Sequence, residues 1–290
     1  MLGVLLINKP KGLTSHDIVN TMRRRFSTRR VGHAGTLDPM ATGLLVVAIG
    51  PATRFLQYLP LEPKEYVATI QFGRTTDSYD AEGVTVAEAE VPEDLERRIH
   101  AAIPGFMGLI QQTPPMFSAV KVRGKPLYSY ARKGQELVRE SRTVHISTYE
   151  ILSVEGTQAT ARIVCSGGTY IRSLAYDLGE VLGCGAHLCA LQRTKVGRFS
   201  HTQAKELDEV GPADLVSLNE TLPPMPLIQL NEMQTRRVRE GQPVGLAEPP
   251  PALLVALLEP SGAVFSVARV QGNLLMPECV IPSEALHEDS

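Results

Sequence analysis

Apolar and polar positions follow two different periods along this chain, and the periods predict strands and helices in turn. Two continuous apolar runs, GVLLINKP ending at Pro10 and GLLVVAIG at 43–50, predict short buried strands. The segment 64–73 alternates between apolar and polar residues, which predicts a strand with one buried face. The residues expected on that face are Tyr66, Ala68, Ile70 and Phe72.

Helices are predicted where the apolar period lengthens and start or stop signals flank it. In the segment 14–26, Thr14 and Asp17 have the spacing of a capping box, in which each side chain accepts a backbone N–H of the first turn. The other predicted helices are 51–59, with a proline at its start, 92–103, which is amphipathic, and 169–183, with a glycine stop.

Most remaining segments predict hairpin-like pairs rather than regular strand–helix–strand units. HISTYEILSVEG and QATARIVCSGG predict an antiparallel pair, and 187–200 predicts a further strand region. Residues 111–134 are punctuated by Pro and Gly and predict an extended loop with a short helix near LYSYARKG. This mixture predicts the α+β class, with a mixed, largely antiparallel sheet flanked by helices.

A change of composition near residues 219–229 predicts a domain boundary. The residues that follow contain a basic helix, MQTRRVREG, a proline run and two apolar strands. A chain of 290 residues is long enough for one large and one small domain. We therefore expect a main domain over 1–222 and a small, mostly β module over 226–290.

Charge is nearly balanced over the whole chain but is unevenly distributed along it. Lys and Arg number 29 against 31 Asp and Glu, so net charge alone does not indicate a nucleic-acid partner. However, RRRFSTRR at 23–30 carries five arginines and no acid, and residues 118–145 carry seven basic residues against two glutamates. The acids dominate between residues 77 and 96. This segregation favours a polyanionic partner over simple surface solvation.

The motifs of several common protein classes are missing from the sequence. The four cysteines include no CxxC pair, so zinc and redox sites lack support and reduced, buried thiols in a cytoplasmic protein are expected. No apolar stretch reaches the ~18 residues of a membrane-spanning helix, and the N-terminal run is short for a signal peptide. GxGxxG, Walker A and HExxH patterns are also absent.

GHAGTLDPMATG at 32–43 places one carboxylate, Asp38, in a loop of small residues. Pro39 biases the backbone of Asp38 toward extended geometry, and the nearby glycines allow backbone to approach a ligand closely. A lone Asp-Pro is more often a turn or cap. A second unusual stretch, CSGGTYIRSL at 165–174, offers Tyr170 as a stacking surface and Arg172 as a partner for a carboxylate, the alternatives being a core tyrosine and a surface arginine.

Together these stretches resemble the tRNA pseudouridine synthases of the TruB type. GHAGTLDPMATGLL is similar to the catalytic motif of that family, KEYVA to its second motif and GTYIRSLAYDLGEVLGCGAHLCALQR to its third. INKPKGLTSHD and TPPMFSAVKVRGKPLYSYARKG also match, so the similarity runs from about residue 3 to residue 198. The resemblance implies a pseudouridine synthase fold over 1–222, with 118–142 as an insertion that folds over RNA, and a PUA-like module over 226–290.

The resemblance also implies roles for individual side chains. Asp38 matches the essential aspartate, Tyr66 the tyrosine that stacks on the target base, and Arg172 the arginine that pairs with the catalytic acid. The remaining matches are Tyr170 and Leu191 in the uracil pocket, His33 beside the flipped loop, Lys9 as a structural lysine near the site, and Arg123, Lys125, Arg132 and Lys133 as RNA contacts.

The activity implied is isomerisation of the uridine at position 55, in the T-loop of tRNA. The reaction breaks the C1′–N1 bond and makes a C1′–C5 bond without net redox change, so no cofactor or metal is expected. The expected partner is the T-arm of tRNA, without a guide RNA and without a membrane, and the expected state is a cytoplasmic monomer. Whether Asp38 attacks sugar or base, or removes a proton, stays open.

Three other functions fit parts of the sequence. A non-catalytic RNA-binding or RNA-folding protein would use the same basic surface but would not need Asp38. A glycoside hydrolase would need paired carboxylates, such as Asp38 and Asp80, with a raised pKa on one of them. A guide-RNA-dependent relative usually carries a longer C-terminal region with basic tails, whereas this chain ends in HEDS.

Overall fold

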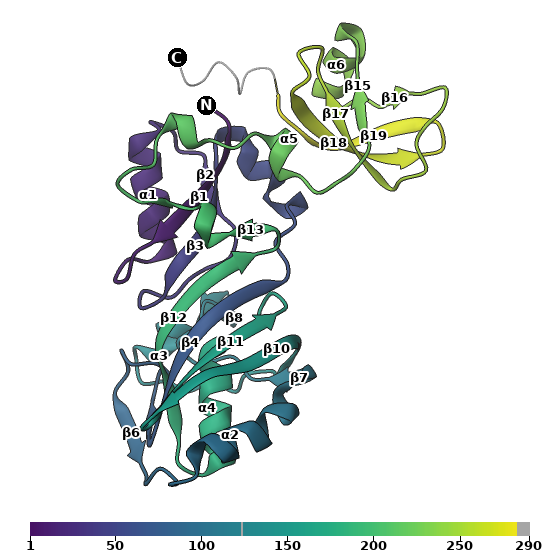
Figure 1. Cartoon of the computed structure of the whole chain (residues 1–290). Helices are drawn as coiled ribbons and strands as arrows, with labels where there is room; N and C mark the ends of the chain where they lie inside the picture. The colour runs from purple at the N-terminus through teal and green to yellow at the C-terminus, as the bar shows by residue number, and fades with distance from the viewer. Residues whose placement is uncertain (123, 283–290) are drawn as a thin grey trace. The chain divides into compact units, whose positions relative to one another are not determined.

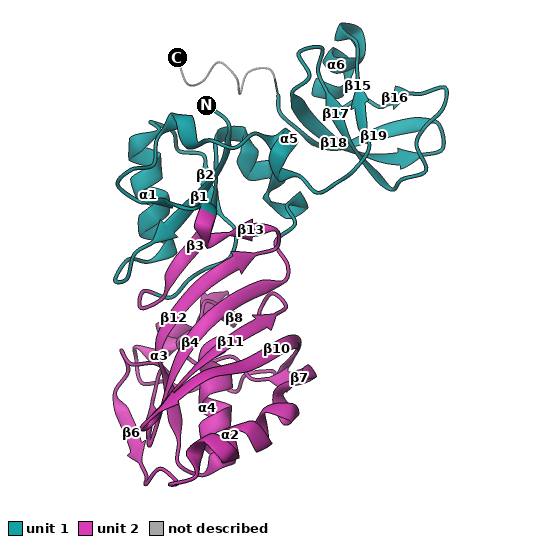
Figure 2. Cartoon of the chain, viewed as in Figure 1, with its two compact units in different colours: residues 1–38, 45–60, 203–290 teal, residues 39–44, 61–202 magenta. Residues whose placement is uncertain are grey.

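A computed structural model describes residues 1–122 and 124–282 of the chain. The chain divides into two compact units (Figure 2): unit 1 contains residues 1–38, 45–60 and 203–290, and unit 2 contains residues 39–44 and 61–202. Strand β3 (Thr42–Ile49) begins in unit 2 and ends in unit 1. No helix in the described ranges has the length and the hydrophobicity required to cross a membrane.

Unit 1 contains one end of the main sheet, and helix α1 packs against it. The strands β14, β1 and β3 are neighbours in that order, and β2 pairs with β3. Helix α1 packs Ile18 and Met22 into the same core as Leu5 of β1. The elements of this part are β1 (Gly3–Lys9), α1 (Ser15–Arg25), β2 (Val31–His33), the 3₁₀ helix η1 (Gly50–Tyr58), β14 (Lys205–Glu206), the 3₁₀ turns η3 (His201–Gln203, at the junction of the two units) and η4 (Pro212–Asp214), and α5 (Leu218–Thr221).

The predicted start of α1 is confirmed. The Thr14 side chain accepts the backbone N–H of Asp17, and the Asp17 carboxylate accepts the backbone N–H of Thr14 at 2.8 Å. The pKa of Asp17 is lowered by the hydrogen bonds from Thr14, as expected for a carboxylate that accepts two donors. The capping box therefore sets where the helix begins.

Unit 2 is built on the rest of the main sheet, of order β3-β12-β4-β11-β10-β7, with β13 paired to β12. The predicted antiparallel pair is β10 with β11, and β4 lies between β11 and β12. The elements of this unit are β4 (Lys64–Phe72), β5 (Arg74–Thr76), β6 (Thr85–Glu88), α2 (Leu95–Ala102), η2 (Ile103–Phe106), β7 (Gly108–Gln112), β8 (Lys121–Val122), β9 (Lys125–Pro126), α3 (Leu127–Ala131), β10 (Arg142–Glu155), β11 (Gln158–Cys165), α4 (Ile171–Leu182), β12 (Ala186–Val196) and β13 (Phe199–Ser200).

Helices α2 and α4 lie on one side of this sheet (Figure 1). The alternation predicted for 64–73 is confirmed, because burial along β4 alternates and the buried residues are Tyr66, Ala68, Ile70 and Phe72. Gly179 lets α4 approach the sheet closely: a Cβ there would lie 2.1 Å from the backbone N of Ala186. The predicted glycine stop of α4 is also confirmed, since Gly183 adopts a left-handed φ of 75°.

Two features differ from the sequence expectation. The segment 51–59 forms a 3₁₀ helix, η1, in which Ala52 and Phe55 are buried three positions apart, the period of a 3₁₀ helix. The short strands β2, β7 and the β5–β6 hairpin were not predicted. Strands of three to five residues carry too few alternations to be recognised, and their pairing is decided by their neighbours.

Residues 227–280 form a second sheet, of order β15-β17-β18-β19-β16. Its elements are β15 (Leu227–Gln229), α6 (Glu232–Arg239), β16 (Val244–Gly245), β17 (Leu254–Leu258), β18 (Val264–Gln271) and β19 (Leu274–Val280). The predicted basic helix and the two apolar strands are all present. Contacts with η1, including a hydrogen bond of 2.9 Å from Arg54 Nη1 to the carbonyl of Val280, group this sheet with unit 1. All four cysteines are free, and three of them are buried.

Candidate active site

The loop that carries Asp38 is fixed by its backbone. Strand β2 leads into it, and the Ala34 N–H donates to the carbonyl of Val46 at 2.9 Å. The Ser15 hydroxyl, buried at the start of α1, accepts the N–H of Leu37 at 2.8 Å and donates to its carbonyl at 3.2 Å. Asp38 itself is half-buried. Sequence reasoning did not single out Ser15, whose only visible trait is its place next to the helix cap.

Gly43 serves a purpose different from the one expected. The glycines of this loop were predicted to let backbone approach a ligand. Instead, Gly43 has a φ of +98°, and a Cβ there would lie 2.4 Å from the carbonyl oxygen of Arg193. The glycine therefore allows β3 to pair closely with β12, where Gly43 is the register partner of Arg193.

Tyr66 and Leu191 lie on adjacent strands of unit 2 and on the same buried face. Leu191 of β12 is opposite Ala68 of β4, and Arg193 is opposite Tyr66. Tyr66 and Leu191 are each 7% exposed, so both side chains are packed and retain a small exposed area. The structure thus places on adjacent strands two residues that the sequence separates by 125 positions, and their place in one pocket stays a prediction.

Arg193 is a buried cation that the sequence analysis missed. Its side chain is fully buried, and its Nε donates to the carbonyl of Leu44 at 2.8 Å. The pKa of Lys64 is lowered mainly by burial and further by the charge of Arg193, and the charge of Glu62 opposes both effects. The visible signal was a charged residue inside a predicted strand region, because burying a charge is costly unless it is compensated.

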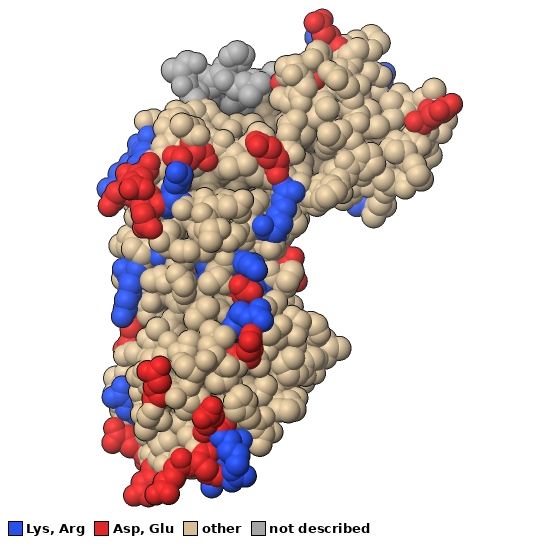
Figure 3. All heavy atoms as spheres, in the orientation of Figure 1, with Lys and Arg blue, Asp and Glu red and all other residues tan. Residues whose placement is uncertain are grey.

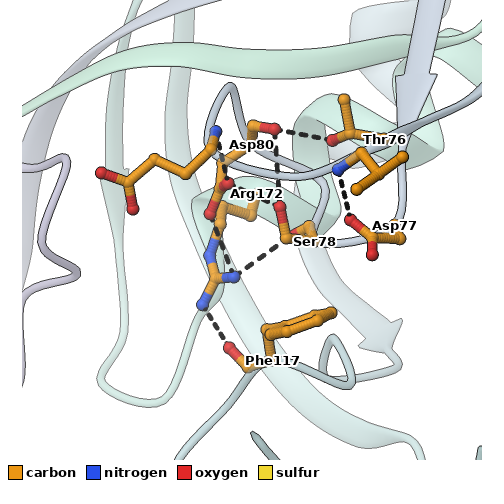
Figure 4. A network of polar contacts seen from close by, with 8 residues as sticks. Thr76, Asp77, Ser78, Asp80, Phe117 and Arg172 are labelled. Atoms are coloured by element: carbon orange, nitrogen blue, oxygen red, sulfur yellow. Dashed lines mark hydrogen bonds and ion pairs between the residues drawn. The ribbon is translucent and has the colours of Figure 1, made fainter. Parts of the chain in front are cut away.

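Arg172 is buried within a polar network in unit 2 (Figure 4). Its Nη1 donates to the carbonyl of Ser78 at 3.0 Å and lies 3.3 Å from Asp80 Oδ2. Its Nη2 donates to the carbonyl of Phe117 at 2.7 Å. The alternative of a surface arginine is therefore wrong. The expected pairing with a carboxylate is met by Asp80, and the pairing with Asp38 stays a prediction.

Asp80 is saturated by donors from its own loop as well as from Arg172. The Ser78 hydroxyl donates to Oδ1 at 2.6 Å, and the Glu82 N–H donates to the same oxygen at 3.1 Å. Asp80 is 5% exposed. Both oxygens of this carboxylate are thus engaged by donors of the protein itself, so Asp80 serves to hold Arg172 and its own loop rather than to face a substrate. This removes the support for a glycoside hydrolase with Asp80 as the second carboxylate.

Tyr170 stands at the N-terminal end of α4, one position before the helix begins. Its backbone is held on both sides by the Gln112 amide, which accepts the N–H of Tyr170 at 2.7 Å and donates to its carbonyl at 3.0 Å. The guanidinium of Arg142 lies 5.0 Å from the ring centroid. The half-buried ring is thus an aromatic surface in contact with a cation rather than part of the core.

Lys9 and His33 belong to unit 1. The Lys9 side chain is fully buried, and its Nζ donates to the carbonyls of Pro10 at 2.9 Å and Leu13 at 2.6 Å. These bonds close the turn before α1, which agrees with the structural role expected for this lysine. His33 is half-buried at the end of β2, opposite Val47, five positions before Asp38.

The expected RNA contacts lie on an exposed segment of unit 2. Lys125, Arg132 and Lys133 are exposed, and the guanidinium of Arg132 lies 5.4 Å from the ring centroid of Tyr128. Arg123 lies outside the described residues. On the face that Figure 3 shows, acidic and basic side chains are interspersed. On the outer side of the sheet, for example, Arg162 pairs with Glu65 at 3.2 Å and with Glu150 at 2.7 Å.

Within the described part of the chain, no three His, Cys, Asp or Glu side chains are arranged to hold a metal ion.

The expected site residues are divided between the two compact units. Asp38, His33 and Lys9 lie in unit 1, and Tyr66, Tyr170, Arg172 and Leu191 lie in unit 2. The chemistry they offer is one half-buried carboxylate, two tyrosine rings with an apolar side chain, and a buried guanidinium.

Two family models match adjacent parts of the chain. The model of the TruB family pseudouridylate synthase N-terminal domain matches residues 23–171. The model of the tRNA pseudouridylate synthase B C-terminal domain matches residues 172–226. The first match alone covers the Asp38 loop, Tyr66 and Tyr170, and the second contains Arg172 and Leu191.

Curated relatives and solved structures agree with these matches. The tRNA pseudouridine synthase B of Opitutus terrae is 48% identical over 77% of this chain and 92% of its own length. The enzyme of the same name from Aromatoleum aromaticum is 41% identical over 99% and 95%, and that of Thermobifida fusca is 42% identical over 96% and 98%. A Cbf5-Nop10-Gar1 complex contains a chain with a TM-score of 0.66 and 26% identity, over 97% of this chain and 86% of that one.

These comparisons confirm the α+β fold expected from the sequence, a pseudouridine synthase fold with a small, PUA-like β module at its C-terminal end. The archaeal Nop10-Cbf5 complex, with a TM-score of 0.64 and 25% identity, covers 98% of the chain. The likeness thus extends across both units and the C-terminal sheet. The chain belongs to the TruB family of pseudouridylate synthases.

Proposed function

We propose that this protein isomerises the uridine at position 55, in the T-loop of tRNA, to pseudouridine, with Asp38 as the catalytic carboxylate. The observation that carries the proposal is the Asp38 loop, which lies inside the family match and has its backbone fixed while the side chain stays half-buried. Relatives named tRNA pseudouridine synthase B, at 41–48% identity over most of the chain, support the same activity.

The reaction needs a carboxylate that is ionised at neutral pH, and an ordinary aspartate, with a pKa of about 3.9, meets that need. The C1′–N1 bond breaks, the freed uracil turns, and a C1′–C5 bond forms; the proton on C5 then moves to solvent and N1 gains one. Asp38 either attacks as a nucleophile or removes a proton from the sugar. Both routes place Asp38 against the target nucleotide, which explains a loop built from small residues.

The uracil must leave the stacked T-loop and enter a pocket. Flipping a base costs a few kcal/mol. Stacking on an aromatic ring offsets about 1–3 kcal/mol of this, and Tyr66 and Tyr170 supply two such rings in unit 2. Leu191, two residues along β12 from the position opposite Tyr66, supplies an apolar wall. Arg172 is the cation proposed to pair with Asp38 and keep it ionised.

The segment 118–142 is proposed to contact the phosphates of the T-arm. Its exposed Lys125, Arg132 and Lys133 have the charge for that role, and phosphate contacts position an RNA and make binding depend on salt. Arg123 is assigned to the same surface from the resemblance alone. We propose that the protein acts as a cytoplasmic monomer, without a guide RNA, and that 1–222 and 226–290 are its domains.

The test is a turnover assay with purified protein, an unmodified tRNA transcript and the isolated T-arm hairpin, with no guide RNA. Pseudouridine is mapped by base-specific chemical labelling. We expect product at the single T-loop uridine and, in Asp38→Asn, a loss of turnover of at least about 10³-fold with RNA affinity retained.

Two results would count against the proposal. Substantial product from Asp38→Asn would remove the catalytic role of that residue. Salt-sensitive RNA binding by the unmodified protein, without any product, would instead favour a protein that binds RNA and assists its folding.

A further inference from the structure

Helix α4 contacts the loop that follows β5 at two points. The first is the ion pair between Arg172 and Asp80 already described. The second is a stacked pair of aromatic rings, Tyr79 and Tyr176, whose centroids are 4.0 Å apart with an angle of 21° between their planes. Tyr176 follows Arg172 by four residues, so both side chains leave the helix on the same face, one turn apart.

The two contacts lie next to each other in both the loop and the helix. In the loop, Tyr79 and Asp80 are consecutive, and in the helix, Arg172 and Tyr176 are successive positions of one face. The loop also joins β12, because the Ala81 N–H donates to the carbonyl of Leu188 at 2.9 Å and the Leu188 N–H donates to the carbonyl of Tyr79 at 3.0 Å. Tyr79 is therefore fixed by its backbone to the sheet and by its ring to the helix.

The backbone of Tyr79 adopts a conformation that a bulky residue rarely takes. Its φ is +64°, in the left-handed region. Glycine is the usual residue there, and the chain uses glycine in most of its other positive-φ turns. A tyrosine kept at such a position indicates that its side chain has a use that outweighs the strain. The ring stack on Tyr176 is that use.

We propose that the Tyr79–Tyr176 stack is a positioning device for Arg172, acting through Asp80. The stack holds the loop on α4, so that Asp80 Oδ2 and the Ser78 carbonyl stay within reach of the guanidinium. Without it, the other contacts described between the loop and the helix all run through Arg172 itself, by its ion pair with Asp80 and its hydrogen bond to the Ser78 carbonyl, and Arg172 gains freedom to rotate. The inference rests on the proposed function, in which Arg172 sets the charge state and position of Asp38.

The first test compares Tyr176→Leu with Tyr176→Phe. Leucine keeps an apolar side chain but removes the ring, and phenylalanine keeps the ring without the hydroxyl. We expect kcat for pseudouridine formation to fall about tenfold in Tyr176→Leu, with KM changed less, because a small misplacement of a catalytic group acts on the chemical step. Tyr176→Phe should restore kcat. An unchanged kcat in folded Tyr176→Leu would overturn the proposal.

The second test separates the ring of Tyr79 from its strained backbone. Tyr79→Leu keeps the strain and removes the ring, whereas Tyr79→Gly removes both. If the stack positions Arg172, both variants lose kcat to a similar extent. If only the backbone conformation matters, Tyr79→Gly keeps full activity, and the proposal is wrong.

A double-mutant comparison tests whether the stack acts through Asp80. In an Asp80→Asn background, Tyr176→Leu should lower kcat by less than about twofold, because the connection to Arg172 is already broken. Equal effects of Tyr176→Leu in both backgrounds would show that it acts elsewhere. A merely structural role would lower the melting temperature without this dependence on Asp80.

Hydrogen exchange provides a readout that does not depend on catalysis. The amides of Ala81 and Leu188 should exchange faster in Tyr176→Leu than in the unmodified protein, and Tyr176→Phe should restore their protection. Unchanged protection of these amides in Tyr176→Leu would show that the Tyr79–Tyr176 stack does not hold the loop, even if the protein proved to have another activity. If the unmodified protein formed no pseudouridine in tRNA, the proposed function would be wrong, and the exchange data would still show whether the stack holds the loop.

Discussion

The Asp38 loop and the Arg172 network are two parts of the site that are built in opposite ways. Asp38 stands in a segment of small residues, and it is the backbone of the loop that is held, by Ser15 at Leu37. Arg172 is held by its side chain, which is buried among Ser78, Asp80 and Phe117. One design positions a half-buried carboxylate through the backbone of its loop. The other holds a charged group still and away from water.

The difference explains why the two parts respond differently to change. A half-buried side chain that is exchanged for one of nearly the same shape, as in Asp38→Asn, changes the packing little. A buried charge cannot be exchanged in this way, because its partners are left with unsatisfied charge when it is removed. The Asp38 loop should therefore be sensitive in activity, and the Arg172 network in stability as well as activity.

The largest effect on stability is expected from Asp80→Ala. The substitution leaves the guanidinium of Arg172 buried without its carboxylate, and breaking a buried pair from one side costs about 3–5 kcal/mol. Urea unfolding followed by circular dichroism measures the change. Asp38→Asn, by comparison, should alter the free energy of unfolding by less than about 1 kcal/mol.

A double variant separates the missing charge from the missing packing. Asp80→Leu combined with Arg172→Met replaces the ion pair by apolar side chains and should be more stable than Asp80→Ala alone. It should also be inactive, because it has no guanidinium. If Asp80→Ala unfolded at the same urea concentration as the unmodified protein, the contrast drawn between the two parts would be wrong.

A smaller effect is expected from Ser15→Ala. The substitution removes two hydrogen bonds to Leu37 and leaves buried backbone groups without partners, which costs about 1–3 kcal/mol. Because Leu37 precedes Asp38 directly, kcat should fall together with stability. The exposed neighbour His16 gives a control at the same helix end, since His16→Ala leaves the loop contacts intact. Equal kcat values for the two variants would show that Ser15 does not position Asp38.

The same contrast explains which parts of the site could be predicted from the sequence. The Asp38 loop is contiguous, so its composition and its family motif could be recognised directly. The strands around Tyr66 were predictable because alternation over nine residues is a long signal. Asp80 was noted only as a possible second acid, and Phe117 and Ser78 were not noted at all. Their contacts with Arg172 join residues 55 to 94 positions apart, and such pairings arise only from the tertiary fold.

Arg193 and Gly43 show a second limit. An arginine in a strand and a glycine beside a catalytic motif each have a common interpretation, as a surface charge and as room for a ligand. In this protein the arginine is fully buried, and the glycine makes space for its backbone. The sequence contains both residues, but the close approach of β3 to β12 that couples them is a property of the sheet.

The smallest effect concerns Asp177, a carboxylate on the same helix as Arg172 but in an apolar setting. It lines a cavity of about 330 Å³ with Phe106 and Val181. Burial, and then the neighbouring charge of Glu180, raises the pKa of Asp177 from 3.8 to about 6. Helix α4 thus contacts one carboxylate and carries another. Asp80, in the loop after β5, is paired with the cation Arg172 of this helix, whereas Asp177, on the helix itself, has the acidic neighbour Glu180.

The sign of the pH effect follows from the raised pKa. Well below pH 3.8 the carboxyl is neutral in both the folded and the unfolded state, and it imposes no penalty. As the pH rises toward 6, the unfolded chain ionises more readily than the folded one, so the free energy of unfolding falls; above about 6 the penalty is constant. Asp177→Asn should therefore be more stable than the unmodified protein at pH 7.5, by about 1 kcal/mol after allowing for solvent screening, and by less at pH 4.5. Glu180→Gln removes the same charge from an exposed position and should show a weaker dependence. Parallel pH profiles for the two variants would mean that burial does not set the pKa of Asp177.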